Sequence, residues 1–169
     1  MPAAEVEVSA DLVRRLLADQ HPDLVPLPVK FLDRDAVLRV WDAVLAAPGY
    51  GGPPVWLHGD LHPANVLVND GQVSGVIDFG DITAGDPASD LSVAWMLLPL
   101  GCHDSFWSAY QAAGGAGGLV GGALRTRATG WALNLAIVFL AHSEDNPVLL
   151  GVGRRTLSTV LEDQRGPVG

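Results

Sequence analysis

The chain has little of what a secreted or membrane protein requires. Its 169 residues include one cysteine, Cys102, so no disulfide can form within the chain, and we expect a reducing, cytoplasmic location. The first residues, MPAAEVEVSAD, lack a basic region followed by an apolar core, so we expect no signal peptide. The longest apolar run, Trp131 to Ala141, is too short to span a bilayer and contains Asn134.

Basic residues are also scarce, with ten against nineteen acidic residues and a formal net charge of −9. This balance disfavours nucleic acid and anionic membranes as partners. A polycationic small molecule is compatible with it, because amines need carboxylates to replace their hydration, although solubility alone also accounts for such a charge. Hydrophobic residues make up 49% of the chain and charged residues 17%, which indicates an ordered globular domain.

No glycine-rich phosphate loop is present. The tract Gly114 to Gly122 contains six glycines, but neither Gly-x-Gly-x-x-Gly nor Gly-x-x-x-x-Gly-Lys can be placed on it. No strand pattern precedes the tract, so we expect an ordinary loop.

Most residues able to do chemistry lie in one stretch, from Val55 to Asp90, which reads VWLHGDLHPANVLVNDGQVSGVIDFGDITAGDPASD. A short apolar run leads into a polar loop, residues 58–63, and two further apolar runs, 65–68 and 73–77, flank Asn69-Asp70-Gly71. Asp-Gly between two apolar runs is a strong hairpin signal. The stretch therefore predicts a strand end, a loop and a β-hairpin.

The hairpin would place Asn65 at the start of its first strand and Asp78 just after its second, so that the two lie side by side. An amide oxygen and a carboxylate form a hard-oxygen site suited to Mg2+, with Asp60 on the adjoining loop. Taken singly, each of these residues has an ordinary interpretation as a turn former. Their joint spacing around a hairpin favours a site.

A second metal chemistry is disfavoured. In an extended segment His58, Asp60 and His62 point to the same side, and Gly-Asp-x-His also occurs in dinuclear metallophosphoesterases, whose metals are held by Asp and His. That family needs a further Gly-Asn-His motif, which the chain lacks. We therefore interpret His62, which precedes Pro63, as structural.

The order His58-x-Asp60-x-x-x-x-Asn65, followed by Asp78-Phe79-Gly80, resembles the catalytic loop and metal motif of protein-kinase-like enzymes. The segments HGDLHPANVLV, VIDFGD and GDPASDL are similar to the aminoglycoside phosphotransferase family, which also contains choline and homoserine kinases. The similarity is specific over Val55 to Leu91 and looser elsewhere.

The resemblance implies a role for each motif residue. Asp60 would be the catalytic base that orients or deprotonates the acceptor hydroxyl, with His58 in the same catalytic motif orienting the loop. Asn65 and Asp78 would hold Mg2+ on the phosphates of ATP or GTP. Asp90 would brace the catalytic loop, and its position after Pro87 also makes it a candidate cap for a helix starting at Leu91.

The reaction implied is phosphoryl transfer to a hydroxyl of a small molecule. An aminoglycoside antibiotic is one candidate acceptor, which would make antibiotic resistance the biological role. The alternative is a noncatalytic, truncated kinase-like lobe that acts as a binding or interaction module.

The remaining patterns are mainly helical. Apolar spacing and caps predict helices over 10–20, 34–47, 91–98, 104–113, 123–141 and 154–163. The fold class expected is α+β, mainly helical, similar to the C-terminal lobe of the protein-kinase-like fold with one β-hairpin. We expect residues 1–30 to form an N-terminal helix and proline-rich linker, and residues 31–169 to form the kinase-like helical lobe.

The resemblance also implies a small nucleotide-binding lobe for which this chain has no room. The one lysine, Lys30, lies in a linker-like setting, Pro28-Val29-Lys30-Phe31. The face around residues 58–63 and 78–81 would be left open. We expect the N-terminal segment or a second copy of the chain to cover it, the latter giving a homodimer.

Overall fold

The computed structural model describes residues 34–115 and 121–165. The chain divides into one unit of residues 1–34 and another of residues 35–169, and the description below concerns the second unit together with Arg34. The helix expected after Ser9, the proline-rich linker and Lys30 lie outside the described residues. The predicted boundary at residue 30 therefore stays a prediction.

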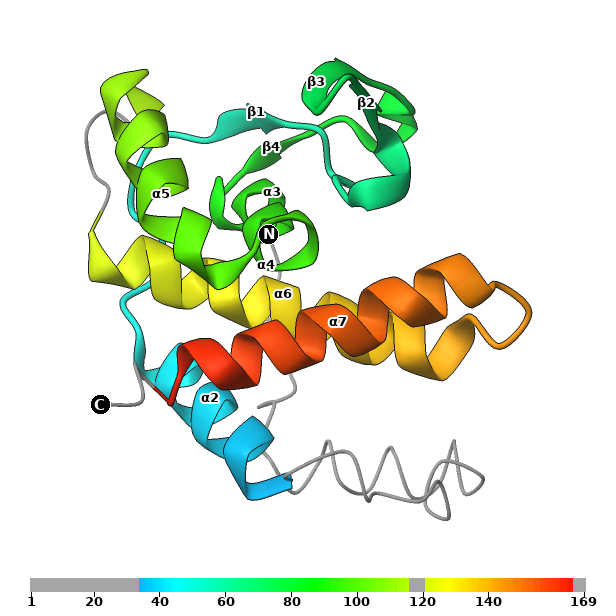
Figure 1. The fold of residues 1–169 in the computed structure, drawn as a ribbon. Coiled ribbons are helices and arrows are strands. Elements are labelled where there is room, and N and C mark those ends of the chain that lie inside the picture. The colour runs from blue at the N-terminus through cyan, green and yellow to red at the C-terminus, as the bar shows by residue number, and fades with distance from the viewer. Residues whose placement is uncertain (1–33, 116–120, 166–169) are drawn as a thin grey trace, which may run out of the picture. The chain divides into compact units, whose positions relative to one another are not determined.

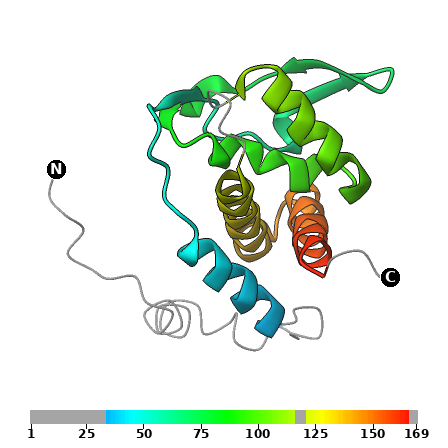
Figure 2. The ribbon, with the colours of Figure 1, turned by 90° about the vertical axis from the view of Figure 1, so that its left-hand side faces the viewer.

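The second unit is built mainly from helices (Figure 1). They are α2 (Arg34–Ala46), α3 (Ala88–Leu91), α4 (Val93–Leu97), α5 (His103–Ala112), α6 (Gly122–His142) and α7 (Pro147–Asp163). The long helices α6 and α7 lie side by side and antiparallel in both ribbon views, joined by residues 143–146 (Figures 1 and 2). None of the helices within the described ranges is long and apolar enough to cross a membrane.

The core forms around α6, whose buried side chains pack against α3, α4 and α7, while Trp131, Ile137 and Val138 of the same helix stay exposed. The side chains of Trp95, Leu133 and Val160, from α4, α6 and α7, are fully buried. Gly130 of α6 lies so close to α2 that an added Cβ would meet Val44 at 2.5 Å. A glycine at this position lets the two helices approach.

The strands form two separate antiparallel pairs. In the first, β1 (Val55–Leu57) pairs with β4 (Thr83–Gly85). In the second, β2 (Val66–Asn69) and β3 (Gln72–Val76) form the hairpin, with a register shift between Leu67 and Val68. Short 3-10 turns, η2 (Pro63–Asn65) and η3 (Phe79–Asp81), flank the hairpin, and a third, η4 (Leu100–Cys102), precedes α5.

The predicted fold class, mainly helical with one β-hairpin, is confirmed. Two helix predictions are wrong in detail. The single helix expected over 91–98 is two short helices that begin at Ala88 and break at Ser92. The last helix begins at Pro147, not at Arg154, because the Asn146 side chain accepts hydrogen bonds from the N–H groups of Val148 and Leu149 and proline takes the first helical position.

Candidate active site

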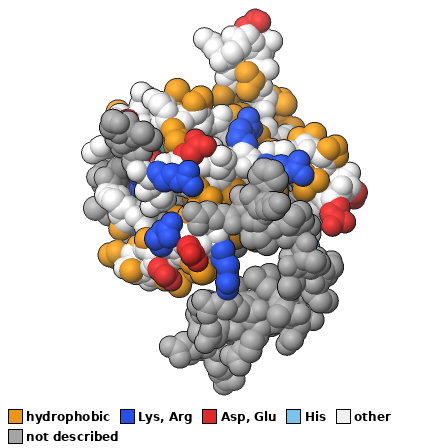
Figure 3. All heavy atoms as spheres, turned by 60° about the horizontal axis from the view of Figure 1, so that its bottom comes forward, with side chains coloured by type: hydrophobic (Ala, Val, Ile, Leu, Met, Phe, Trp, Pro, Cys, Tyr) orange, Lys and Arg blue, Asp and Glu red, His pale blue; other side chains and the backbone are white. Residues whose placement is uncertain are grey.

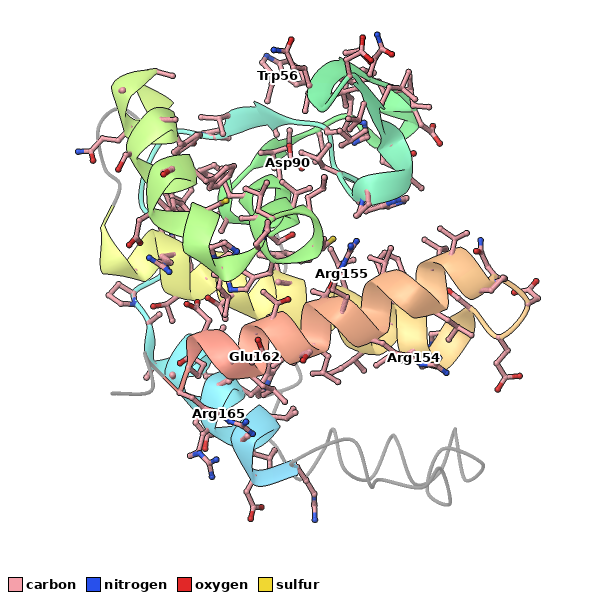
Figure 4. All side chains as sticks on the ribbon, viewed as in Figure 1. Trp56, Asp90, Arg154, Arg155, Glu162 and Arg165 are labelled. Atoms are coloured by element: carbon pink, nitrogen blue, oxygen red, sulfur yellow. The ribbon has the colours of Figure 1, made fainter. Side chains whose placement is uncertain are left out.

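Asp90 of α3 holds the loop that follows β1. Its carboxylate accepts hydrogen bonds from the backbone N–H of His58 at 2.7 Å and of Gly59 at 3.1 Å. Hydrogen bonds to an ionised acceptor are roughly twice as strong as neutral ones, so this pair fixes the loop against α3. Asp90 lies below β1 in Figure 4, within α3 and not at its start. The expectation that Asp90 caps a helix starting at Leu91 is wrong, since the cap position is Pro87.

α3 is itself held in place by Asp86. One oxygen of this carboxylate accepts from the backbone N–H of Ala88 at 3.1 Å, and the other lies 2.6 Å from Nε of Arg127 on α6. The Arg127 guanidinium also donates to the Pro48 carbonyl at 2.8 Å. Because α3 is held in place, the Asp90 carboxylate stays within hydrogen-bond distance of the loop.

His58 joins the loop to the end of β3. Its Nδ1 accepts from the backbone N–H of Asp60 at 3.3 Å, and its Nε2 lies 2.8 Å from the carbonyl oxygen of Ile77. These two contacts require Nε2 to carry the proton. The ring is buried and packs against Phe79 at a centroid distance of 4.7 Å. Both ring nitrogens are therefore engaged by the backbone, an arrangement that orients the loop.

Gly59 is required by the shape of the loop. Its φ is 88°, in the left-handed region that favours glycine. A Cβ at this position would also collide with the carbonyl oxygen of Asp81. The loop thus passes against the η3 turn with no space for a side chain.

Asp60 presents its carboxylate to solvent, with the side chain 42% exposed. One of its oxygens lies 3.4 Å from Nε2 of His62, while Nδ1 of His62 accepts from the backbone N–H of Ala64 at 3.2 Å. The His62 ring also packs edge-on against Phe139 of α6. From the sequence we interpreted His62 only as structural. Residues 58, 60 and 62 point to the same side of an extended segment, and this alternation was the signal that could have placed His62 beside Asp60.

Asn65 links Asp60 to the hairpin. Its buried side-chain amide donates from Nδ2 to the carbonyl oxygen of Asp60 at 2.9 Å. The backbone carbonyl oxygen of Asn65 accepts from the backbone N–H of Ile77 at 3.0 Å, which puts the start of the hairpin opposite its end. Asp78 is the next residue after Ile77, so the structure brings all three predicted residues to one end of the hairpin.

Asp78 has an unusual backbone. Its φ of 62° and ψ of 63° are left-handed, and only Asp70, in the hairpin turn, shares a positive φ among the described non-glycine residues. Such conformations are tolerated by aspartate but are strained, and they cluster at functional sites. The Asp78 residue is exposed, so its carboxylate is accessible from solvent.

The residues present fit a metal that arrives with a nucleotide. Within the part of the chain that the structure describes, no three His, Cys, Asp or Glu side chains gather in a way that could hold a metal ion by themselves. Mg2+ is usually bound by one or two carboxylates together with waters and substrate phosphates. The Asn65 side-chain nitrogen is hydrogen-bonded to the Asp60 carbonyl oxygen, so its amide oxygen and the Asp78 carboxylate are the groups that would hold such an ion.

Two described cavities lie elsewhere. One, of about 250 Å3, is formed by α2, α6 and the end of α7 and includes Arg125 and Asp163. The other, of about 260 Å3, lies between the glycine-rich segment before β1 and the start of α6. Neither is lined by Asp60, Asn65 or Asp78. The candidate site is thus distinct from both cavities.

Residues 2–129 match the family model described as "Phosphotransferase enzyme family", abbreviated APH, and the chain belongs to this family. The suspected aminoglycoside phosphotransferase relationship is thereby confirmed. A comparison with curated protein sequences gives no match.

Solved structures similar to the chain include macrolide 2'-phosphotransferase MphH from Brachybacterium faecium, with 24% identity and a TM-score of 0.49 over 90% of this chain and 52% of that one. Another is a thermostable mutant of aminoglycoside phosphotransferase APH(4)-Ia in ternary complex with AMP-PNP and hygromycin B, with 18% identity and a TM-score of 0.47 over 90% and 52%. The chain thus spans about half the length of the solved structures it matches.

Proposed function

We propose that the chain serves in nucleotide- and Mg2+-dependent phosphoryl transfer to a hydroxyl of a small molecule. The observation that carries the proposal is a set of hydrogen bonds that fix the loop. Asp90 accepts from the backbone at the start of the loop, and Asn65 donates to the carbonyl oxygen of Asp60. Phosphoryl transfer depends almost entirely on positioning and electrostatics. A loop held at both ends by side-chain-to-backbone hydrogen bonds, from Asp90 and from Asn65, supplies the first of these.

In this proposal Asp60 is the base that accepts the proton of the acceptor hydroxyl. Its carboxylate is exposed enough to reach a substrate, and His62 limits its orientation through the 3.4 Å contact. His58 acts on the loop backbone and not on the substrate. Asn65 and Asp78 would hold the Mg2+ that accompanies ATP or GTP. When bound, that ion neutralises charge on the transferred phosphoryl group.

The acceptor we propose to test first is an aminoglycoside. The acidic net charge of −9 suits a cationic acceptor, and one of the matched structures is a complex with hygromycin B. The other matched protein is a macrolide 2'-phosphotransferase, so a macrolide is the second acceptor to test. Activity on either would make antibiotic resistance in the cytoplasm the proposed role.

The alternative is a noncatalytic binding module. It is favoured by the exposed apolar side chains beside the loop, Trp56, Phe79 and Ile82, because such surface is typical of a contact with another molecule. Under this alternative the loop and hairpin would be retained for binding, and no phosphoryl transfer would occur.

Calorimetry of the full chain with ATP and with GTP, each in the presence and absence of Mg2+, separates the two functions. The phosphotransferase proposal expects Mg2+-dependent nucleotide binding, followed by transfer of labelled phosphate to hygromycin B or a macrolide. Asp60→Asn should abolish transfer while keeping nucleotide binding, because the amide has the shape of the carboxylate but cannot accept the proton. A chain that binds neither nucleotide would contradict the phosphotransferase and favour the binding module.

A further inference from the structure

Exposed apolar side chains are concentrated near the candidate site. Most of the large ones found among the described residues fall between positions 56 and 82, namely Trp56, Leu67, Val68, Val73, Val76, Ile77, Phe79 and Ile82. Trp56 is 81% exposed and points away from Asp90 on the outer side of β1 (Figure 4). A tryptophan side chain offers roughly 150–250 Å2 for burial, so this residue alone leaves a large apolar area in water.

The hairpin carries one of its apolar faces in the open. Val66 lies opposite Val76 and Val68 opposite Val73, and alternation along β2 places both pairs on the same side. Val68 is 57% exposed and Val73 is 66% exposed. We call these four valines the hairpin face. Figure 2 shows the hairpin extending past the helices, so nothing in the described part of the chain covers its tip.

The hairpin and its flanking turns carry carboxylates but no lysine or arginine, and of the nearby aspartates Asp86 and Asp104 pair with Arg127 and Arg125 of α6. Between Arg39 and Arg125 the sequence contains no lysine or arginine but eight aspartates, at positions 42, 60, 70, 78, 81, 86, 90 and 104. Asp70, in the turn, and Asp78, just after β3, lie at the two ends of the hairpin. The described arginines all lie on α2, α6 and α7 or just after α7, and several gather on the side of the molecule shown in Figure 3.

The charge of each possible occupant decides whether it complements the hairpin face. A second copy using the same face would add further aspartates and no lysine or arginine from the hairpin, and like charges across an interface are destabilising. The N-terminal segment, residues 1–33, contains three basic and six acidic residues, so it is also acidic. Neither a second copy nor the N-terminal segment therefore complements the charge of the hairpin face.

We propose that the hairpin face docks a polypeptide surface outside these 169 residues, apolar at its centre and bearing lysine or arginine at its rim. Burial of the valines would supply affinity, and a cation opposite Asp70, in the hairpin turn, would supply specificity and a faster encounter. This inference does not depend on catalysis, because it rests on the hairpin register, the exposed side chains and the charge distribution.

The test uses a labelled synthetic peptide of 18 residues in which leucine and lysine alternate to give one apolar and one basic face. Fluorescence anisotropy measures its binding to the full chain, with a leucine–glutamate peptide of the same pattern and a scrambled leucine–lysine peptide as controls. The proposal expects the patterned basic peptide to bind at least about tenfold more tightly than either control.

Variants then locate the binding surface. The double variant Val68→Thr/Val73→Thr keeps side-chain shape and strand propensity, and it should weaken binding about tenfold because it places hydroxyls in the apolar contact. Asp70→Asn, which tolerates the left-handed turn, should weaken binding and reduce its salt dependence. Val148→Thr is the matched control, since Val148 is 63% exposed on α7, and it should leave binding unchanged.

Three results would overturn the proposal. They are equal binding of the acidic peptide, an equal loss with Val148→Thr, and a dimer in light scattering that Val68→Thr/Val73→Thr dissociates. The last would make a second copy the occupant. Circular dichroism of each variant checks that the fold is retained, so a loss of binding reports the surface.

Discussion

The Asp90 carboxylate lies 2.7 Å from the backbone nitrogen of His58, a residue 32 positions earlier in the chain. This contact joins α3 to the loop that bears Asp60, and the Gly59 N–H reinforces it at 3.1 Å. The geometry of the candidate site therefore depends on a residue that need not touch a substrate.

Asp90→Ala should lower the melting temperature of the chain. Hydrogen bonds to a charged group contribute roughly 1.5–3 kcal/mol each, and about 1 kcal/mol shifts the midpoint by roughly 2–4 °C in a chain of this size. Thermal melts followed by circular dichroism should therefore show a decrease of several degrees. Asp42→Ala, at an exposed position on α2, is the control and should melt like the parent. An unchanged melting curve for Asp90→Ala would count against the bracing role.

Gly59→Ala should destabilise the chain more than Gly71→Ala does. Both glycines have positive φ, 88° and 75°, so alanine is strained at either position. Only at Gly59 would the new methyl group also collide, with the Asp81 carbonyl oxygen, whereas nothing lies within 4 Å at Gly71. Urea unfolding of the two variants measures the difference. Equal losses would show that the loop can move away from η3 at little cost.

Asp78→Asn should weaken Mg2+ or Mn2+ binding in the presence of ATP, by about tenfold or more, because ligand charge governs affinity at a hard-cation site. Asparagine tolerates the left-handed backbone, so the local fold should persist. Asp70→Asn is a matched control, since Asp70 has the same backbone region but lies in the hairpin turn. Calorimetric titration with Mn2+ gives both affinities, and equal values would make the metal assignment wrong.

The chain should lose stability in mild acid because of His103, at the start of α5. Its ring is almost fully buried and edge-on to Trp95, and neither ring nitrogen has a hydrogen-bond partner. Burial lowers the pKa of His103 below its usual 6.5. The negative charge of Asp163 raises the pKa and so offsets part of this effect, whereas the positive charge of Arg125 lowers it further. The backbone of Leu98 and Ala94 also raises the pKa, although neither group meets hydrogen-bond geometry with the ring.

Because the folded-state pKa of His103 is the lower one, the unfolded chain takes up the proton first as the pH falls. The stabilisation is therefore complete above pH 6.5 and decreases below it, with a slope of at most about 1.4 kcal/mol per pH unit. His103→Phe keeps the ring contact but removes the titration. Urea unfolding at pH 7.5 and pH 5.5 should show a smaller loss for the variant than for the parent, and parallel losses would contradict the role of His103.

The sequence was most informative where local chemistry decides the structure. Asp70-Gly71 between two apolar runs predicted the hairpin, and the hairpin in turn placed Asn65 beside the end of β3. The sequence was least informative where a segment is structured by an interaction with another part of the chain. Thr83-Ala84-Gly85 has no alternating apolar pattern, and β4 exists because β1 pairs with it. The contact of His62 with Asp60 likewise depends on the η2 turn.

Helix starts show the same limit. The apolar spacing from Arg154 onward is recognisable, but α7 starts seven residues earlier. Its start is marked by Asn146 as the cap and Pro147 as the first helical residue, a local signal and not an apolar periodicity. The break at Ser92 has a tertiary cause that periodicity does not carry, because α3 is held from Asp86 and Arg127 while α4 packs against α7.

The pairing of β1 with β4 has a consequence for how the chain can vary. Val55 lies opposite Gly85, so residues 55–85 leave and re-enter the helical body at the same place. A segment whose two ends adjoin can lengthen, shorten or be transplanted between scaffolds at a single junction, and the path of the remaining chain need not change. The loop, hairpin and η3 turn thus form one excursion from the helical body, and a change within it would have to keep its contacts with Asp90 and Phe139.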